Sequence, residues 1–264
     1  MLTSPANPLL KDVRRAIARG GLTDQGYLVA ETFHLLDEAL RSDLDIRAIL
    51  AAESVHETVR DRVRRLSGLR IAVVDDDAFQ KLADTETSQG VIMLAVPPSW
   101  RLEQTLCGEG PAVALDGLQD PGNAGAIVRA AEAFGATGVL FTKGTVSPFN
   151  PKTLRASAGS LFRVPFVHGL DAAQISAAFE QAGAEVYAAM PRGARPLPEV
   201  DLRRKCAIVI GSEAHGVSEP LLSGATGLSI PTQGVESLNA AVAAAVLLYE
   251  ARRQRSESAR TIAS

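Results

Sequence analysis

Short apolar strands alternate with helical segments along almost the whole chain, and this alternation restricts the fold more than any other feature of the sequence. Runs such as GVLFT (138–142) and CAIVIG (206–211) are apolar almost throughout. Continuous apolar runs between helices are typical of parallel strands covered on both faces. The sequence therefore predicts an α/β protein with a parallel sheet between helical layers.

A break in this pattern divides the chain into two expected domains. Residues 96–111, VPPSWRLEQTLCGEGP, hold three prolines and two glycines and interrupt the periodic patterns. We expect a small α/β domain over 1–99, a linker over 100–110 and a larger α/β domain over 111–264. A length of 264 residues agrees with two domains.

Composition excludes several classes of protein. The chain is 46% apolar and 22% charged, which is ordinary for a globular protein. Two cysteines, Cys107 and Cys206, exclude a disulfide framework, and the four histidines show no metal-ligand spacing. No apolar run reaches the ~18 residues of a membrane span, and the first residues do not resemble a signal peptide. We expect a cytoplasmic protein with no metal and no membrane association.

Charge is distributed unevenly. The net charge of −3 does not indicate a nucleic-acid partner, yet residues 121–170 hold five basic side chains and one acidic one. A second basic cluster consists of Arg60, Arg62, Arg64, Arg65 and Arg70. Such clusters are usually solvated helix faces, so charge alone assigns no partner.

The first candidate site is LDGLQDPGNAGAIVRAAEAFGA, residues 115–136, where a strand ends and a helix begins. On the expected helix 123–134, Arg129 lies off the apolar stripe and above Gly125, which fills no space. An open helix start can bind an anion, and Asn123 is a candidate N-cap. A surface role for Arg129 stays an equal alternative. A dinucleotide site is disfavoured because the glycine spacing is wrong and the next strand ends in Thr142-Lys143 without an acid.

Two later segments also carry candidate residues. In AIVIGSEAHGVSE (207–219) a strand runs into Gly211, Glu213 and Gly216, and a loop at this end of a strand lines the usual ligand crevice. In LSIPTQGVESLNAAVAAAVLLYE (228–250) we expect a helix over 237–255 that begins at Ser237 as its N-cap. Its expected buried stripe is Leu238, Val242, Val246 and Tyr249. Capping and simple exposure explain Ser237 and Asn239 equally well.

In this order, the three segments resemble the motifs of the SpoU (TrmH-type) RNA 2′-O-ribose methyltransferases of the SPOUT superfamily. The matching residues are Asn123, Gly125, Arg129, Gly211, Ser212, Glu213, Gly216, Ile230, Pro231, Ser237, Leu238 and Asn239. RASAGSLFRVPFV (155–167) is also similar to the family, and the first hundred residues resemble its substrate-binding domain. Two positions depart from that likeness: Thr32 stands where relatives usually have glycine, and Ser88 where a proline is common.

The resemblance implies a SPOUT domain with a trefoil knot at its carboxyl end, a property that pattern analysis would not propose. It also implies a homodimer, S-adenosylmethionine as the cofactor and structured RNA as the substrate, with ribosomal RNA favoured and tRNA as the alternative. Arg129 would stabilise the reacting ribose oxygen, with Asn123, Glu213, Ser237 and Asn239 orienting it and the ribose. The cofactor contacts carried over are Gly211, Ile230, Leu238, Thr142 and Gly216.

Two alternatives from other classes stay open at this point. One is a catalytically inactive RNA-binding relative, which the intact motif residues disfavour. The other is a dinucleotide-dependent oxidoreductase, which the missing acid disfavours. The Arg60–Arg70 cluster is a candidate RNA contact in the substrate-binding domain, since such domains recognise RNA shape and backbone charge.

Overall fold

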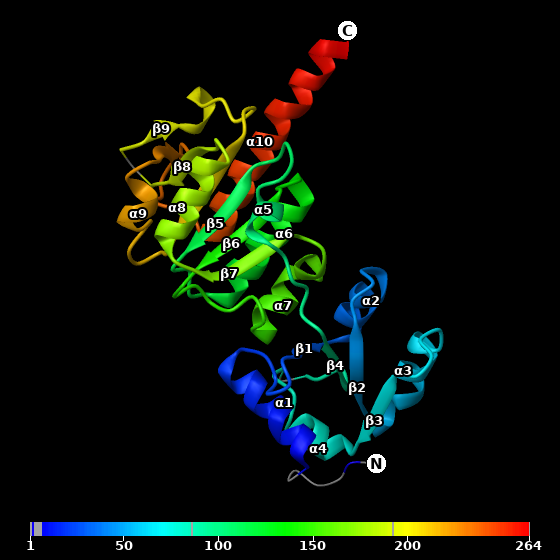
Figure 1. The fold of residues 1–264 in the computed structure, drawn as a ribbon. Coiled ribbons are helices and arrows are strands. Elements are labelled where there is room, and N and C mark those ends of the chain that lie inside the picture. Colours follow the sequence, from blue (N-terminus) through cyan, green and yellow to red (C-terminus); the bar gives the residue numbers. More distant parts are fainter. Residues whose placement is uncertain (1, 3–6, 86, 192, 264) are drawn as a thin grey trace. The chain divides into compact units, whose positions relative to one another are not determined.

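The computed structural model describes residues 2, 7–85, 87–191 and 193–263. The chain forms two compact units (Figure 1). The first comprises residues 1–98 together with 147–162, and the second comprises 99–146 together with 163–264. The segment 147–162 therefore belongs with the amino-terminal residues, although it stands within the expected carboxyl-terminal domain.

The first unit contains a four-stranded mixed sheet in the order β1-β4-β2-β3. Both β1 and β2 pair with β4 in antiparallel register, and β3 pairs with β2 in parallel. This order makes β3 an edge strand. The strands are β1 (Leu28–Glu31), β2 (Ile46–Ala52), β3 (Arg70–Val74) and β4 (Val91–Ala95).

Helices cover both faces of this sheet. The apolar side chains of α1 (Pro8–Arg19) and α4 (Asp76–Gln80) form one core cluster with residues from the strands. The buried residues of α2 (Phe33–Arg41) and α3 (His56–Val63) lie outside that cluster, so these helices cover the opposite face. In the segment 147–162, which belongs to the same unit, α7 (Pro151–Ser157) contacts β1.

Thr32, at the departure from the family pattern, has a φ of +105° and caps α2 through its hydroxyl. A positive φ is a steric outlier for a β-branched residue and is the conformation that glycine adopts without strain. The preceding residue, Glu31, is only 2% exposed. Its carboxylate accepts hydrogen bonds from the Thr85 and Ser88 hydroxyls and lies beside Arg155 of α7. The second departure, Ser88, is thus part of the shell that satisfies a buried charge.

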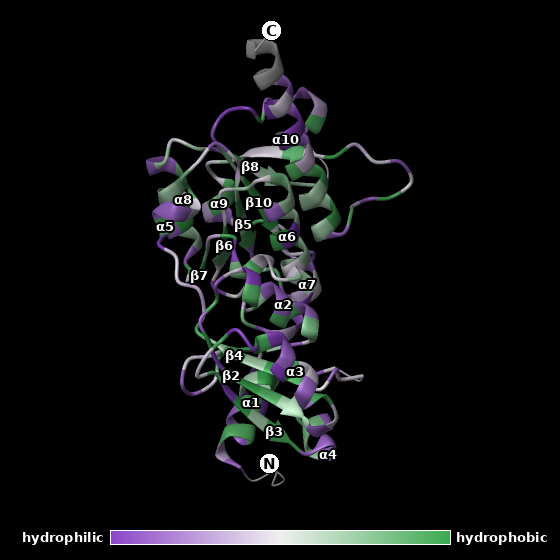
Figure 2. Ribbon diagram, turned by 90° about the vertical axis from the view of Figure 1, so that its right-hand side faces the viewer, coloured by the Kyte–Doolittle hydropathy of each residue, from purple (hydrophilic) through white to green (hydrophobic). Residues whose placement is uncertain are grey.

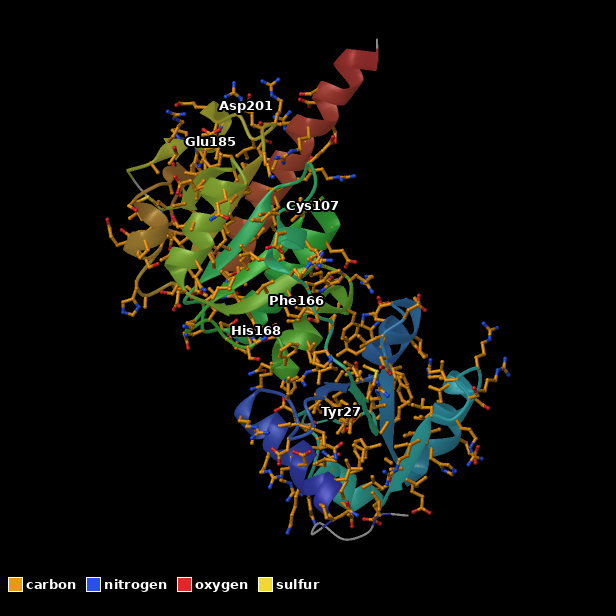
Figure 3. All side chains as sticks on the ribbon, in the orientation of Figure 1. Tyr27, Cys107, Phe166, His168, Glu185 and Asp201 are labelled. Atoms are coloured by element: carbon orange, nitrogen blue, oxygen red, sulfur yellow. The ribbon has the colours of Figure 1, made fainter. Side chains whose placement is uncertain are left out.

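The second unit contains a seven-stranded sheet whose recorded pairings are all parallel. This arrangement confirms the predicted α/β fold with a parallel sheet. The edge strand β7 carries Phe166 and His168, which Figure 3 labels. In spatial order the strands are β7 (Phe166–Leu170), β6 (Gly138–Thr142), β5 (Ala112–Asp116), β10 (Cys206–Gly211), β8 (Glu185–Ala189), β11 (Thr226–Ser229) and β9 (Arg195–Pro196).

Helices cover both faces of this sheet as well, and Figure 2 shows the central strands β5 and β10 as hydrophobic. On one face, α5 (Leu102–Thr105), α8 (Ala172–Gln181) and α9 (Glu219–Leu222) share an apolar core with the strands. On the other, α6 (Pro121–Phe134) packs against α10 (Ala240–Ala263), and α10 contacts β10. Short 3-10 turns stand at Glu53–Val55, Ser160–Phe162 and Leu197–Glu199.

The last helix corrects two expectations. It begins at Ala240, and Asn239 caps it by accepting hydrogen bonds from the backbone N–H groups of Ala241 and Val242, so Ser237 is not the N-cap. The expected buried stripe is also wrong, because Val242, Val246 and Tyr249 are 49%, 37% and 56% exposed. The buried face instead consists of Ala240, Ala244, Leu247, Leu248 and Ala251. Small alanine side chains on that face suit the close approach of α6.

None of the described helices is long and apolar enough to cross a membrane. Within the same residues, no group of three or more His, Cys, Asp or Glu side chains is placed to hold a metal ion.

Candidate active site

Three polar side chains that are far apart in the sequence meet at the carboxyl ends of β5 and β10. The amide of Asn239 donates from Nδ2 to Oδ1 of Asn123 across 2.9 Å. In turn, Nδ2 of Asn123 donates to Oε1 of Glu213 across 2.6 Å. The two amides therefore form a directed chain of hydrogen bonds that ends on a carboxylate. A charged acceptor makes the last of these bonds the stronger one.

The local structure explains why the two amides are fixed in this orientation. Asp120, not Asn123, caps α6, since its carboxylate accepts from the backbone N–H of Asn123 across 2.6 Å. Pro121 follows at the first helical position, where its missing N–H costs nothing. Asn239 uses its Oδ1 to cap α10, which leaves its Nδ2 directed at Asn123. Helix capping thus orients the side chains that form the hydrogen-bonded chain.

A cavity of about 260 Å³ lies beside this chain. Six of the site residues that were expected from the sequence line this cavity. Its wall combines apolar side chains with two carboxylates. Residues that follow β8 were not anticipated, because the sequence does not show that β8 pairs with β10. The lining consists of Ala189, Met190, Pro191, Ile210, Gly211, Ser212, Glu213, Gly216, Leu228, Ile230, Thr232, Glu236, Ser237, Leu238, Ala240, Ala243 and Leu247.

The loop that carries Glu213 folds back tightly on the end of β10. Ser212 and Gly216 exchange two backbone hydrogen bonds of 3.2 and 2.9 Å. A Cβ at Gly211 would lie 2.2 Å from the carbonyl carbon of Gly216, so only glycine permits this approach. Gly216 has a φ of +67° and open space around it. The two glycines are therefore required for different reasons: Gly211 for close packing and Gly216 for backbone conformation.

A buried carboxylate that the sequence analysis did not single out anchors the far end of this loop. Asp116, the last residue of β5, is 6% exposed, and its Oδ2 accepts from the backbone N–H of Ser218 across 2.6 Å. Gly211 is its register partner on β10. The sequence could have identified Asp116 as a candidate site residue, because it ends an apolar strand just before Gly117. The carboxyl ends of such strands line the usual ligand crevice of an α/β sheet. Asp116 therefore holds the loop that contributes to both the cavity and the hydrogen-bonded chain.

Two expected site residues lie outside this arrangement. Thr142 is 4% exposed, does not line the cavity, and accepts a hydrogen bond from the backbone N–H of Gly117 across 3.0 Å. It supports the turn that precedes α6. Arg129 is exposed on α6, six residues after Asn123, which corresponds to about 9 Å along the helix axis. Among the described residues no acidic side chain forms an ion pair with Arg129, so its guanidinium is available to a ligand.

The chain is similar to known families and proteins over most of its length. The SpoU rRNA Methylase family matches residues 110–249, and the MRM3-like substrate binding domain matches residues 7–93. An uncharacterized tRNA/rRNA methyltransferase of Synechocystis is 35% identical over 260 residues, covering 96% of this chain and 94% of that protein. A 23S rRNA (guanosine(2553)-2′-O)-methyltransferase of Bacillus subtilis is 32% identical over 257 residues, covering 95% of this chain and 98% of that protein.

A solved structure is similar over nearly the same length. The AdoMet-bound rRNA methyltransferase from Sinorhizobium meliloti superposes with a TM-score of 0.81 at 28% identity. The match covers 96% of this chain and 97% of the other. These proteins, matched by sequence and by structure, are thus all named as rRNA or tRNA/rRNA methyltransferases.

Proposed function

The chain belongs to the SpoU rRNA Methylase family, and from this premise we propose that it transfers the methyl group of S-adenosylmethionine to a ribose 2′-hydroxyl of RNA. The observation that carries the proposal is the hydrogen-bonded chain of Asn239, Asn123 and Glu213 at the edge of the cavity. It supports the proposal because a carboxylate and two amides, groups that can hydrogen-bond a hydroxyl, lie together beside a cavity that can hold a cofactor.

The residues of the cavity fit S-adenosylmethionine. Ile230, Leu238 and Leu247 offer the apolar wall that an adenine ring needs, and the backbone of the Gly211 loop offers polar groups at its rim. Glu213 and Glu236 supply negative charge for a cationic ligand. The cofactor contributes an electrophilic methyl group on a sulfonium, so the reaction requires no metal from the protein.

The remaining chemistry concerns the acceptor hydroxyl, which is a weak nucleophile while protonated. A group must stabilise the negative charge that develops on its oxygen. We assign this role to Arg129, whose guanidinium is exposed and unpaired, and which also suits an RNA phosphate. A guanidinium is not deprotonated in proteins, so Arg129 serves as an electrostatic stabiliser and not as the base. Asn123, Glu213, Ser237 and Asn239 orient the ribose.

The substrate of this proposal is ribosomal RNA. The support is the 23S rRNA methyltransferase of Bacillus subtilis, which matches over almost its full length, and the substrate-binding family that matches the first unit. A cytoplasmic location belongs to the same proposal, because relatives that modify ribosomal RNA act where ribosomes are made. Gly211, Gly216, Ile230 and Leu238 are the cofactor contacts we propose.

Two structural features, one of assembly and one of the fold, complete the proposal. The first is a homodimer, supported by the exposed stripe of Val242, Val246 and Tyr249 at helical spacing on α10. Large apolar side chains in a contiguous stripe mark an interaction surface. The second is a trefoil knot at the carboxyl end. It is supported by the spatial order β5-β10-β8-β11, in which β10 lies between the earlier strands β5 and β8 and β11 pairs with β8 on its other side.

The test uses purified protein, ribosomal RNA and S-adenosylmethionine carrying a labelled methyl group. Label should appear in RNA, and alkaline hydrolysis should leave an uncleaved dinucleotide at the labelled position, because a methylated 2′-oxygen cannot attack the neighbouring phosphate. Label on a base, with normal alkaline cleavage, would show a different reaction. Binding of the RNA with no methyl transfer would favour a catalytically inactive relative.

A further inference from the structure

Most arginines of the first unit are already neutralised by acidic neighbours. Each of six arginines between positions 15 and 62 lies in an ion pair with a carboxylate of the same unit. Such exposed pairs contribute little to stability, but they reduce the positive charge that an approaching polyanion meets. The pairs are Arg15 and Arg19 with Asp24, Arg41 with Glu38, Arg47 with Asp45, Arg60 with Glu57, and Arg62 with Asp37.

Three arginines at the turn from α3 to β3 are different. Arg64 and Arg65 directly follow α3, and Arg70 is the first residue of β3. All three are exposed, and no acidic side chain in the described part of the chain forms an ion pair with any of them. The turn between them, residues 66–69, contains no charged residue. We call these three residues the α3–β3 arginines.

The structure thus divides the basic cluster that is visible in the sequence. Arg60 is bound to Glu57, and Arg62 is bound to Asp37 and lies 4.7 Å over the ring of Phe33. Of the five arginines of this cluster, all of which the structure describes, only the α3–β3 arginines are exposed and without an ion pair. Three like charges within seven positions repel one another, and no carboxylate among the described residues lies within ion-pair distance of them.

We infer that the α3–β3 arginines bind the phosphate backbone of the substrate RNA. This inference rests on the proposed function and adds the surface by which the first unit engages the RNA. Guanidinium groups bind phosphate through two parallel hydrogen bonds, and each phosphate contact releases condensed counterions. Arg64, Arg65 and Arg70 are all exposed, although the backbone of Arg70 pairs with Ala48 of β2, so their guanidinium groups can reach a ligand from solvent.

The experiment compares two triple variants of the full-length protein. The first, Arg64→Ala/Arg65→Ala/Arg70→Ala, removes the surface. The second, Lys11→Ala/Arg14→Ala/Lys81→Ala, removes three cations that are also exposed and without recorded ion pairs but belong to α1 and the end of α4. The net charge changes equally in both. Circular dichroism should show unaltered folding, because all six positions are exposed.

The measurement is the affinity for a fluorescein-labelled 23S rRNA transcript at several salt concentrations. In the parent protein, each phosphate contact contributes about 0.7–0.9 to the slope of log Kd against log salt. The first variant should lose about 2 to 3 units of slope and bind at least 10-fold more weakly at low salt. The control variant should keep the parental slope. Arg64→Lys/Arg65→Lys/Arg70→Lys should keep most of the parental slope, because the slope depends on charge.

Several results would overturn the inference. A parental slope in the first variant would exclude phosphate contacts, and an equal loss in both variants would reduce the effect to net charge. Loss of binding to vesicles of anionic lipid, with RNA binding unchanged, would assign the arginines to a membrane surface. The proposed function fails separately, since it fails when the parent protein transfers no methyl group to RNA.

In the first variant, calorimetric affinity for S-adenosylmethionine and single-turnover rate at saturating RNA should equal those of the parent.

Discussion

Asn123 donates a hydrogen bond of 2.6 Å to Glu213, which lies ninety positions later in the chain. This bond joins the first turn of α6 to the loop after β10. In Asn123→Asp the donor at this position is replaced by an acceptor, so two carboxylates would face each other. We expect methyl transfer to fall 100-fold or more, since removing one positioned hydrogen-bond donor has this scale.

The same variant should separate chemistry from cofactor binding. Asn123 does not line the cavity, whereas Glu213 does. Calorimetric affinity of Asn123→Asp for S-adenosylmethionine should therefore remain within a few-fold of the parent value. Glu213→Gln is the matched variant, since it keeps the shape of the partner and removes its charge, and it should weaken both affinity and rate. Equal loss of cofactor affinity in the two variants would contradict this division of roles.

The two glycines of the cofactor loop give a second prediction. Gly211→Ala places a Cβ 2.2 Å from the backbone of Gly216, so the loop must move and calorimetric affinity for S-adenosylmethionine should fall at least 10-fold. Gly216→Ala meets no atom within 4 Å and suffers only from its φ of +67°, a cost of about 1 kcal/mol. Its affinity should fall by less than 10-fold. The reverse ranking would show that the loop adopts another conformation when the cofactor binds.

The sequence predicted the parallel sheet because apolar runs report burial directly, and that signal is local. The buried face of α10 was predicted wrongly for a related reason. Two faces of that helix are apolar: one carries Val242, Val246 and Tyr249, and the other carries Leu247 and Leu248 beside three alanines. The deciding fact is the close packing of α10 on α6, which is a long-range contact. The hydrogen bond between Asn123 and Asn239 spans 116 positions and is equally invisible to local patterns.

Thr32 gives a prediction about stability. Its φ of +105° strains a β-branched residue by about 1–3 kcal/mol, while replacing threonine by glycine at a helix N-cap costs only a few tenths. Thr32→Gly should therefore raise the free energy of unfolding by about 1 kcal/mol, visible as a higher denaturant midpoint. Thr32→Ala keeps the strain and removes the cap, so it should lower the midpoint. A lower midpoint in the glycine variant would mean that the strain is not present in solution.

The two cysteines should react very differently. Cys107, labelled in Figure 3, is exposed, whereas Cys206 is buried at the start of β10. Burial raises the pKa of the Cys206 thiol and so keeps it protonated and unreactive at neutral pH. We expect a thiol reagent to modify one cysteine rapidly in the native protein and the second only in denaturant. Cys107→Ser should abolish the rapid phase, and rapid modification that persists in this variant would show that Cys206 is accessible.

The exposed stripe on α10 leads to the last prediction, on assembly. Val242 and Val246 are 49% and 37% exposed, so charged substitutions there should alter the stability of a monomer by less than about 0.5 kcal/mol. In a homodimer formed through this face, Val242→Lys/Val246→Lys would bring four buried lysines together at the interface. Light scattering should then give a mass near 27.8 kDa for the variant and twice that for the parent. Ser256→Lys adds charge to the same helix beyond the stripe and should stay dimeric. A dimeric double variant would place the interface on another surface, and a monomeric parent would remove the homodimer from the proposal.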